Sequence, residues 1–306
     1  MVAFVETLLD KFHERTPIRA GSLIVTVFGD AVVPRGGVLS LTSLHEIMRA
    51  FRISDTLVRT ALSRLVTDGW FERWKVGRNS YYQLTHRGRE AFAQATQRIY
   101  TDPPQDWRGS FELVLLENTQ DRSALRAGLS EAGYGALGPD LLIAAAPSSG
   151  EEGPFLRLSA APADLQTARR LVERAWPLEE IEGRYKRFIN TYSGTLSALE
   201  RGAGFTDLDA LLVRILLIHD YRRAVLRDPL LPPQLLPKPW AGTAARMLCG
   251  TIYKTLLPAA ELWIDTHAQN DKGPLPKVDR SFAQRFAAAQ PLAWTGPSGQ
   301  YVTKIS

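Results

Sequence analysis

Residues 54–69 form a predicted helix with two unlike halves, and this division constrains the fold more than any other feature of the chain. Ser54 can cap its start, Asp55 suits the positive end of the helix dipole, and Gly69 predicts its end. At 100° per residue, the apolar residues share one half of the circumference. The other half carries only polar residues, which are Thr56, Arg59, Thr60, Ser63, Arg64 and Thr67. We therefore expect a helix that packs on one side and exposes two arginines among small hydroxyl residues.

This polar face has the composition of a DNA-reading surface. Small side chains let the backbone approach a major groove, hydroxyl groups can bond phosphates or base edges, and arginine can bind O6 and N7 of guanine. A merely solvated helix face more often carries pairs of Glu and Lys, and this face has none. We predict that Ser54 and the six polar residues contact DNA.

The flanking segments predict a winged helix-turn-helix. Ser43 and Glu46 have the spacing of a capping box and predict a helix to about Phe51. Residues 70–76 and 80–85, which are rich in aromatic and β-branched side chains, predict a hairpin with its turn at 77–79. The hairpin residues expected at phosphates or in the minor groove are Arg73, Lys75, Arg78, Asn79 and Tyr81. The alternative is an exposed basic turn without a partner.

The charge distribution favours a polyanionic partner for this first third. Residues 1–100 contain 14 Lys and Arg against 9 Asp and Glu, while the whole chain has a net charge of +5. The remainder is therefore neutral. A basic module attached to a neutral body is typical of a nucleic-acid-binding protein, although many basic faces are only solvated.

Two composition breaks predict a multidomain α+β protein. A polar stretch with two prolines, 101–106, ends the first domain, and Trp176-Pro177 begins an almost wholly helical region. The expected domains are a winged-helix domain at 1–100, a ferredoxin-like α+β domain at 107–176 and a helical domain of about four helices at 178–306. Within the middle domain, the order is strand 111–116, helix 123–132, strands 141–146 and 155–159, and helix 163–175.

Several protein classes have no support in the sequence. No apolar run approaches the roughly 20 residues of a membrane span, and the first ten residues lack a secretory pattern. Cys249 is the single cysteine, which fits a cytoplasmic protein, and its apolar neighbours favour a core position. The five histidines lack zinc-ligand spacing, and there is no Gly-x-Ser-x-Gly motif. We therefore expect neither a metal nor a cofactor, and no enzymatic activity.

Long segments of the chain resemble the PaaX-type repressors of phenylacetate catabolism. In the first third these are RAGSLIVTVFGD at 19–30, PRGG at 34–37, ISDTLVRTALSRLVTDGW at 53–70 and GRNSYYQLT at 77–85. In the last third they are IHDYRR at 218–223, LRDPLLP at 226–232 and LLPKPWAG at 235–242. The resemblance covers nearly the whole chain with its segments in the same order.

The resemblance implies a homodimeric repressor that binds operator DNA and is released by an aryl-acetyl coenzyme A thioester, typically phenylacetyl-CoA. A two-fold dimer would present two 56–67 helices to successive major grooves of an inverted repeat. A different acid or acyl-CoA as inducer is the alternative, and the dimer interface could lie in the middle or the helical domain.

A basic and aromatic set of residues in the last third could bind such an inducer. Arginine suits the phosphates of coenzyme A, and aromatic rings suit an aryl group. The candidate ligand contacts are Arg184, Arg187, His219, Tyr221, Arg222, Arg223, Arg227, Trp240 and Tyr253. The alternative reading is structural, because Asp220 and Asp228 could pair with the arginines and the aromatic residues could form a dimer interface.

Two enzyme classes are the rival interpretations. A CoA-ester hydrolase needs a nucleophile with a positioned base, and no such pair is evident. The middle domain also resembles the small Cas2 nucleases, which carry an Asp at the end of the first strand where this chain has Glu117. A scaffolding or dimerisation role for the middle domain is the expectation.

Overall fold

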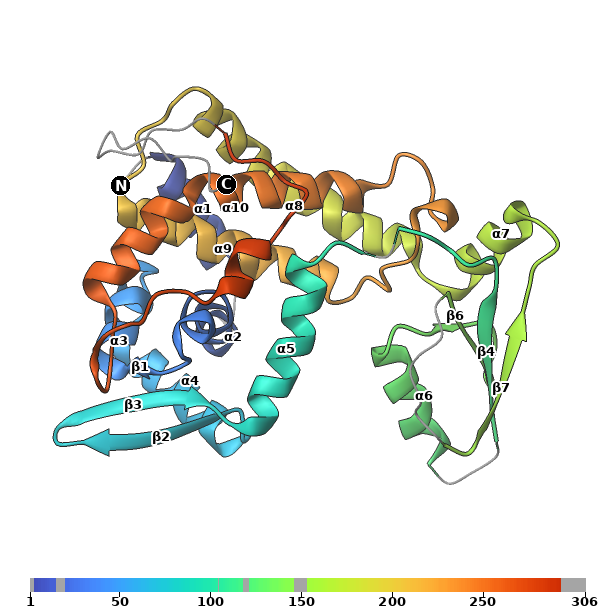
Figure 1. The fold of residues 1–306 in the computed structure, drawn as a ribbon, viewed down its shortest axis with the longest axis horizontal. Helices are drawn as coiled ribbons and strands as arrows, with labels where there is room; N and C mark the ends of the chain where they lie inside the picture. The colour runs from blue at the N-terminus through green and yellow to red at the C-terminus, as the bar shows by residue number, and fades with distance from the viewer. Residues whose placement is uncertain (1–2, 15–19, 104, 118–120, 146–152, 293–306) are drawn as a thin grey trace. The chain divides into compact units, whose positions relative to one another are not determined.

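The computed structural model describes residues 3–14, 20–103, 105–117, 121–145 and 153–292. It combines helices with antiparallel sheets, which confirms the α+β class (Figure 1). The chain forms two compact units. The first contains 1–101, 188–222 and 245–306, and the second contains 102–187 and 223–244. Residues from 178 onward, expected to form one domain, therefore contribute to both units.

The helices of the first third all belong to the first unit. They are α1 Ala3–His13, α2 Ala20–Val27, α3 Leu41–Ala50, α4 Asp55–Thr67 and α5 His86–Tyr100. A π-helical turn, η1 Phe28–Val32, and a 3-10 turn, η2 Val33–Arg35, follow α2 directly.

Among the residues that the structure describes, three long helices occupy the last third, where about four were expected. They are α8 Leu178–Glu200, α9 Asp207–Val225 and α10 Ala241–His267, and each contributes residues to both units. Every residue of α9 from 211 to 219 is buried, because this helix is apolar around almost its whole circumference. Helix α9 is thus a core helix of the first unit. Among the described residues, no helix combines the length and apolar character that crossing a bilayer requires.

A small three-stranded sheet belongs to the first unit. Strands β1 Leu39–Ser40, β2 Phe71–Val76 and β3 Asn79–Leu84 are antiparallel in the order β1-β3-β2. Val76 pairs with Asn79, so the hairpin turn is Gly77-Arg78, with Gly77 at φ +59°. Asn79 is therefore a strand residue, and the prediction that it lies in the turn is wrong. A two-residue turn with a left-handed first residue fits the twist of the paired strands.

Helix α3 begins earlier than its predicted capping box. Ser40 is the N-cap, and its hydroxyl oxygen accepts a hydrogen bond from the Ser43 N–H at 3.1 Å. Ser43 lies inside the helix, and its own oxygen accepts from the Gln269 N–H at 3.0 Å. Gln269 belongs to a short hairpin of β8 Gln269–Asn270 and β9 Gly273–Pro274. The prediction of Ser43 as the cap is therefore wrong by one turn.

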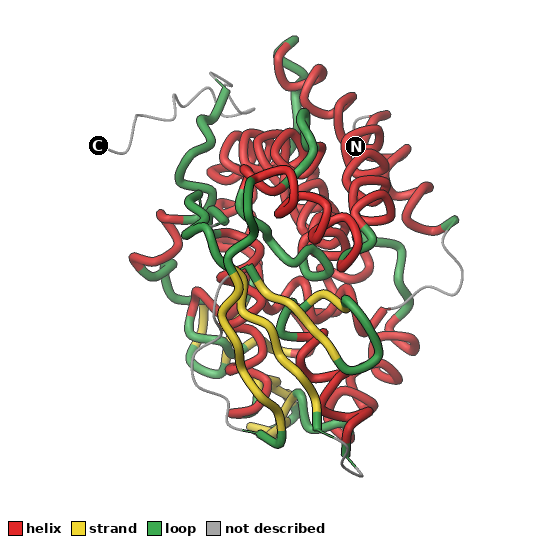
Figure 2. Tube along the Cα trace, turned by 90° about the vertical axis from the view of Figure 1, so that its right-hand side faces the viewer, coloured by secondary structure: helices red, strands yellow, loops and turns green. Residues whose placement is uncertain are grey.

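The second unit contains a four-stranded antiparallel sheet, drawn in yellow with the other strands in Figure 2. Its elements are β4 Phe111–Leu116, α6 Arg122–Glu131, β5 Gly135–Ala136, β6 Leu141–Ala144, β7 Phe155–Ala160 and α7 Leu165–Ala175, and the strand order is β5-β6-β4-β7. Val114 and Leu129 pack in one core cluster, and Phe111 and Val172 pack in another. Helix α7 follows β7 as predicted. Residue 146, the predicted end of a strand, lies outside the described residues.

Two 3-10 turns remain in the part of the chain that the structure describes. They are η3 Pro233–Leu235 and η4 Arg280–Gln284.

Cys249 on α10 is fully buried, and burial raises the pKa of its thiol well above the usual range. The predicted core position of this cysteine is confirmed.

Candidate nucleic-acid interface

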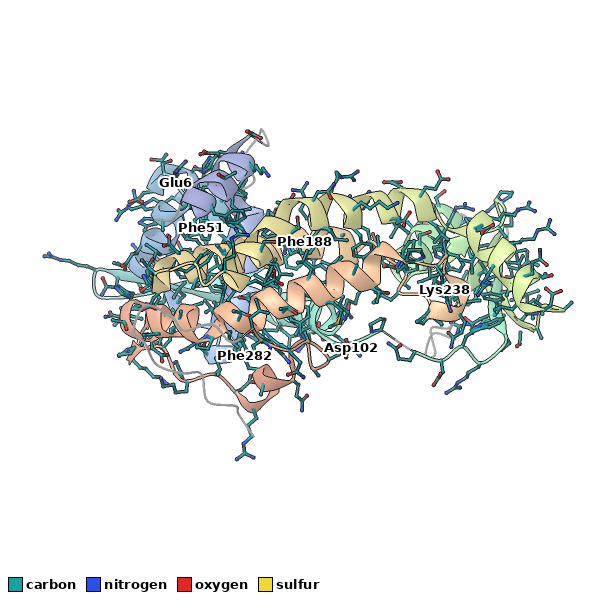
Figure 3. The ribbon with its side chains drawn as sticks, turned by 90° about the horizontal axis from the view of Figure 1, so that it is seen from above. Glu6, Phe51, Asp102, Phe188, Lys238 and Phe282 are labelled. Atoms are coloured by element: carbon teal, nitrogen blue, oxygen red, sulfur yellow. The ribbon has the colours of Figure 1, made fainter. Side chains whose placement is uncertain are left out.

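The turn between α3 and α4 is held by two buried apolar side chains and by the ion pairs of one exposed arginine. Phe51 and Ile53 are buried, and Arg52 between them has φ +59°, a left-handed conformation uncommon outside glycine. The guanidinium of Arg52 pairs with Asp10 of α1 at 2.7 Å, and it also contacts Glu6. Glu6 and Phe51 are labelled in Figure 3. Helix α1 therefore stabilises the turn that sets the direction of α4 relative to α3.

Helix α4 has the bounds and the two faces that the sequence predicts. The Ser54 hydroxyl oxygen accepts from the Leu57 N–H at 3.3 Å, and Gly69 has φ +73° just beyond the helix. Val58 and Leu62 are almost fully buried. The exposed polar residues are Thr56, Arg59, Thr60, Ser63, Arg64 and Thr67. Leu57 departs from its predicted packing, since 36% of it is exposed beside this polar face.

A charged cluster at the start of α4 was not foreseen. Arg49 of α3 donates through Nε to Asp55 Oδ1 at 2.8 Å, and this hydrogen bond holds the pKa of Asp55 below its usual range. His45 Nδ1 lies 3.3 Å from the other carboxylate oxygen. Burial lowers the pKa of His45, and the nearby Arg59 and Arg49 lower it further against the opposing effect of Asp55. The cluster ties the first turn of α4 to α3. Its sequence signal is the basic residue six positions before a helix-starting Asp.

The β2–β3 hairpin places most of its predicted DNA contacts in solvent. Arg73, Lys75, Arg78 and Asn79 are exposed. The Nη2 of Arg73 donates to Ser80 Oγ at 3.0 Å, which orients that guanidinium within the hairpin. Tyr81, the fifth predicted contact, is buried with its ring stacked on Trp74 at a centroid distance of 5.9 Å. Its position suits packing better than contact with a partner.

Four of the nine candidate ligand contacts lie in the first unit, and each is engaged there. His219 and Tyr221 are buried on α9, and Tyr253 is buried on α10. His219 Nδ1 lies 3.1 Å from Thr26 Oγ1, and the Tyr221 hydroxyl accepts from Arg246 at 3.1 Å. Arg222 donates to Ser22 Oγ at 2.6 Å.

The other five candidates lie in the second unit. Arg187, Arg223 and Arg227 are exposed, and Arg184 pairs with Glu180 one helical turn away, at 2.5 Å. The Trp240 ring lies edge-on to Tyr185 at a centroid distance of 6.3 Å. The carboxylate of Asp220 accepts a hydrogen bond from the Tyr192 hydroxyl at 3.1 Å, and that of Asp228 accepts one from the Tyr185 hydroxyl at 2.6 Å. Among the described residues, no group of three His, Cys, Asp or Glu side chains could hold a metal ion, and Glu117 is exposed.

Sequence reasoning missed a buried charged cluster in the first unit. Asp30, in the π-helical turn η1, is 1% exposed and its carboxylate pairs with Arg214 Nε at 2.7 Å and Arg285 Nη1 at 3.1 Å. The hydroxyl groups of Tyr100 and Tyr253 donate to the same carboxylate at 2.7 and 3.0 Å. Burial raises the pKa of both tyrosines, so they remain donors.

Aromatic rings and further acids complete this cluster. The guanidinium groups of Arg214 and Arg285 lie 5.4 and 4.5 Å from the ring centroid of Phe282, which is labelled in Figure 3. Arg214 also pairs with Glu261, which in turn receives a hydrogen bond from Arg35 Nε at 3.1 Å. The available sequence signal was the pair of charges, Asp30 and Arg214, that interrupts two apolar segments.

Comparisons with known proteins match two separate segments of the chain to related protein families. Residues 19–88 match the family described as PaaX-like protein, and residues 176–266 match the PaaX-like protein C-terminal domain. The transcriptional repressor PaaX of Escherichia coli (strain K12) is 33% identical over 299 residues, covering 92% of this chain and 94% of that protein. Among solved structures, the uncharacterized protein Rv0674 from Mycobacterium tuberculosis is similar with a TM-score of 0.48 and 19% identity, covering 72% of this chain and 89% of that one.

Proposed function

Because the chain belongs to the PaaX family, whose members are transcriptional repressors and not enzymes, we propose that it represses transcription by binding operator DNA through α4 and the β2–β3 hairpin. In this proposal, α3, α4 and the three-stranded sheet act as a winged helix-turn-helix. The observation that carries it is the face of six exposed polar residues on α4, which includes two arginines and no acid.

The proposed roles follow from the chemistry of the exposed groups. Arg59 and Arg64 on α4 suit guanine in the major groove, and Leu57 beside them suits a thymine methyl group. Lys75 and Arg78 on the hairpin suit phosphates or the minor groove. Ser54 and the small hydroxyl residues of α4 would contact phosphates or base edges, while Arg73 and Asn79 would support the hairpin contacts.

A two-fold dimer would place two α4 helices in successive major grooves about 34 Å apart, so the operator should be an inverted repeat. We retain the winged-helix, middle and helical domains at 1–100, 107–176 and 178–306 as proposed functional divisions, with the middle one ferredoxin-like. The observed strand order β5-β6-β4-β7 is compatible with such a fold.

The proposed inducer is an aryl-acetyl-CoA, with phenylacetyl-CoA as the first compound to test. The support is the family membership, together with the exposed arginines Arg187, Arg223 and Arg227, whose guanidinium groups suit phosphates. Reciprocal linkage then requires the operator to weaken inducer binding by the same factor by which the inducer weakens operator binding. Equal inducer affinity with and without operator in titration calorimetry would contradict release by this route.

The first test is a gel shift of the purified protein on the DNA upstream of its own gene, with and without phenylacetyl-CoA. A specific shift that the thioester abolishes supports both operator binding and the inducer. A shift that ignores the thioester supports the repressor and points to a different acid or acyl-CoA. If neither this DNA nor a random-sequence library yields a bound site, operator binding is refuted.

A further inference from the structure

A line of three polar contacts joins α2 and η1 to the buried helix α9 within the first unit. We name it the α2–α9 seam, and its pairs are Ser22 with Arg222, Thr26 with His219, and Asp30 with Arg214. We propose that this seam positions α4 for operator recognition, so that His219 and Arg222 are positioning residues and not ligand contacts. The proposal rests on the proposed function, and it uses residues that operator contact itself does not involve.

The contacts are arranged as in a pair of antiparallel helices. Along α2 and η1 they recur every four residues, about one helical turn, while the partner numbers on α9 fall from 222 to 214. The distances are 2.6 Å from Arg222 Nη2 to Ser22 Oγ, 3.1 Å from His219 Nδ1 to Thr26 Oγ1, and 2.7 Å from Arg214 Nε to Asp30 Oδ2. The seam therefore spans α2 and the π-helical turn after it.

The central contact has a defined proton arrangement. The Thr26 hydroxyl donates its hydrogen to the Ser22 carbonyl oxygen at 3.0 Å. Its oxygen can then only accept from His219, which assigns the proton to Nδ1 of the imidazole. Thr26 and His219 are 3% and 4% exposed, so water cannot replace this bond without opening the helices. A displacement of α9 along α2 would leave buried polar groups unpaired, which is costly.

The same α2 helix packs against α4 (Figure 1). A methyl group placed on Gly21 would lie 3.9 Å from both Ala61 Cβ and Leu65 Cδ1 of α4. Gly21 is adjacent to Ser22, the seam residue whose hydroxyl oxygen accepts a hydrogen bond from Arg222. Helix α2 is thus held by polar contacts to α9 and by close apolar packing to α4, and a change in its register would move the polar face of α4.

Thr26→Val is the test variant, because valine keeps the volume and removes the hydroxyl. Thr255→Val is a matched control. Thr255 is also 3% exposed, donates to a carbonyl four residues earlier, Thr251, at 2.7 Å, and accepts from the Leu292 N–H at 2.9 Å. Thr26→Ser restores the hydroxyl and serves as the conservative rescue. Ser22→Ala provides a second, milder variant, since Arg222 keeps the Ser22 carbonyl oxygen at 3.1 Å.

The experiment first selects an operator from a random DNA library with the wild-type protein. Affinity for operator and for non-operator DNA is then measured for every variant, together with the melting temperature. We expect Thr26→Val to weaken operator binding roughly tenfold relative to Thr255→Val, with Ser22→Ala intermediate and Thr26→Ser close to wild type. Non-operator affinity should stay unchanged, because the phosphate-contacting charges remain.

Two results would overturn the inference while leaving the repressor intact. One is equal operator affinity for Thr26→Val, Ser22→Ala and Thr255→Val. The other is normal operator affinity of Thr26→Val together with loss of phenylacetyl-CoA binding, which would return His219 to the ligand site. Failure of the wild-type protein to select any operator would instead refute the proposed function, and the inference with it.

Discussion

At the scale of single residues, Arg64 gives the most direct test of base recognition. Its side chain is exposed on the polar face of α4, and a bidentate contact with guanine would discriminate against other bases. Arg64→Ala should weaken operator binding by roughly 1–3 kcal/mol and relax the base preference at one position. The measurement is a titration against the operator and its single-base variants. Arg201→Ala, which removes an exposed arginine outside the interface, should bind as the parent does.

Lys75 and Arg78 should behave differently from Arg64. If they contact phosphates, replacing either by Ala should weaken binding to all DNA sequences by the same factor. Each replacement should also reduce the slope of log affinity against log salt concentration by about one unit. A loss confined to one base position would assign them to base reading instead.

The buried imidazole of His45 predicts a dependence of stability on pH. Burial lowers its folded-state pKa below the ordinary value of 6.5. The unfolded chain therefore binds a proton more readily, so this contribution to stability is present above pH 6.5 and is lost as the pH falls through 6.5 toward the folded-state value. Asp55, whose pKa is lowered from 3.8, contributes only to changes at more acidic pH.

The measurement is chemical unfolding between pH 7.5 and 5.5. His45→Gln should flatten the decline of the unfolding free energy, whereas His86→Gln, which alters an exposed histidine, should preserve it. Parallel curves for the wild type and His45→Gln would contradict the assignment.

At the scale of secondary-structure elements, helix ends separate what the sequence determines locally from what it does not. Ser54 caps α4 as predicted, and Thr85 caps α5 in the same way by accepting from the Gly88 N–H at 3.1 Å. At α3 two serines three residues apart compete for the cap, and a local pattern cannot choose between them. The choice is settled by Gln269, which lies 226 positions further along the chain and whose N–H donates a hydrogen bond to the Ser43 hydroxyl oxygen.

This correction predicts unequal effects of two substitutions. Ser40→Ala should lower the unfolding free energy by about 1 kcal/mol, because it removes the cap. Glu46→Ala should have little effect, since Glu46 is exposed and Ser43 is not the cap. Urea unfolding distinguishes the two, and a larger loss for Glu46→Ala would restore the capping box.

At the scale of the whole molecule, periodicity predicted which face of α4 is exposed, but it could not predict how the polar residues of α9 are placed. The two halves of α4 differ in polarity, so its exposed face can be derived from sequence. Helix α9 is buried on all sides from 211 to 219, so helical spacing does not indicate which of its residues would face a ligand. Its polar residues contact segments about 190 positions away, and such pairings have no local signal.

The Asp30 cluster should dominate the stability of the first unit. Asp30→Asn removes the charge that Arg214 and Arg285 share, and breaking a buried pair of this kind typically costs 3–5 kcal/mol. Asp68→Asn, at an exposed aspartate, provides the control. We expect a clearly lower denaturant midpoint for Asp30→Asn alone. Equal midpoints for Asp30→Asn and Asp68→Asn would contradict the prediction, because they would mean that the buried arginines do not need the charge of this carboxylate.

The same carboxylate limits how this protein could be recombined. Residues 1–100 look like a portable module, yet Arg214 and Arg285, which neutralise Asp30, come from sequence more than a hundred positions downstream. A chimeric regulator that joins only 1–100 to a foreign sensor would carry an unpaired charge in its interior. Transplantation would then require either the two distant arginines or an apolar replacement of Asp30, so evolution by simple shuffling of this segment is disfavoured.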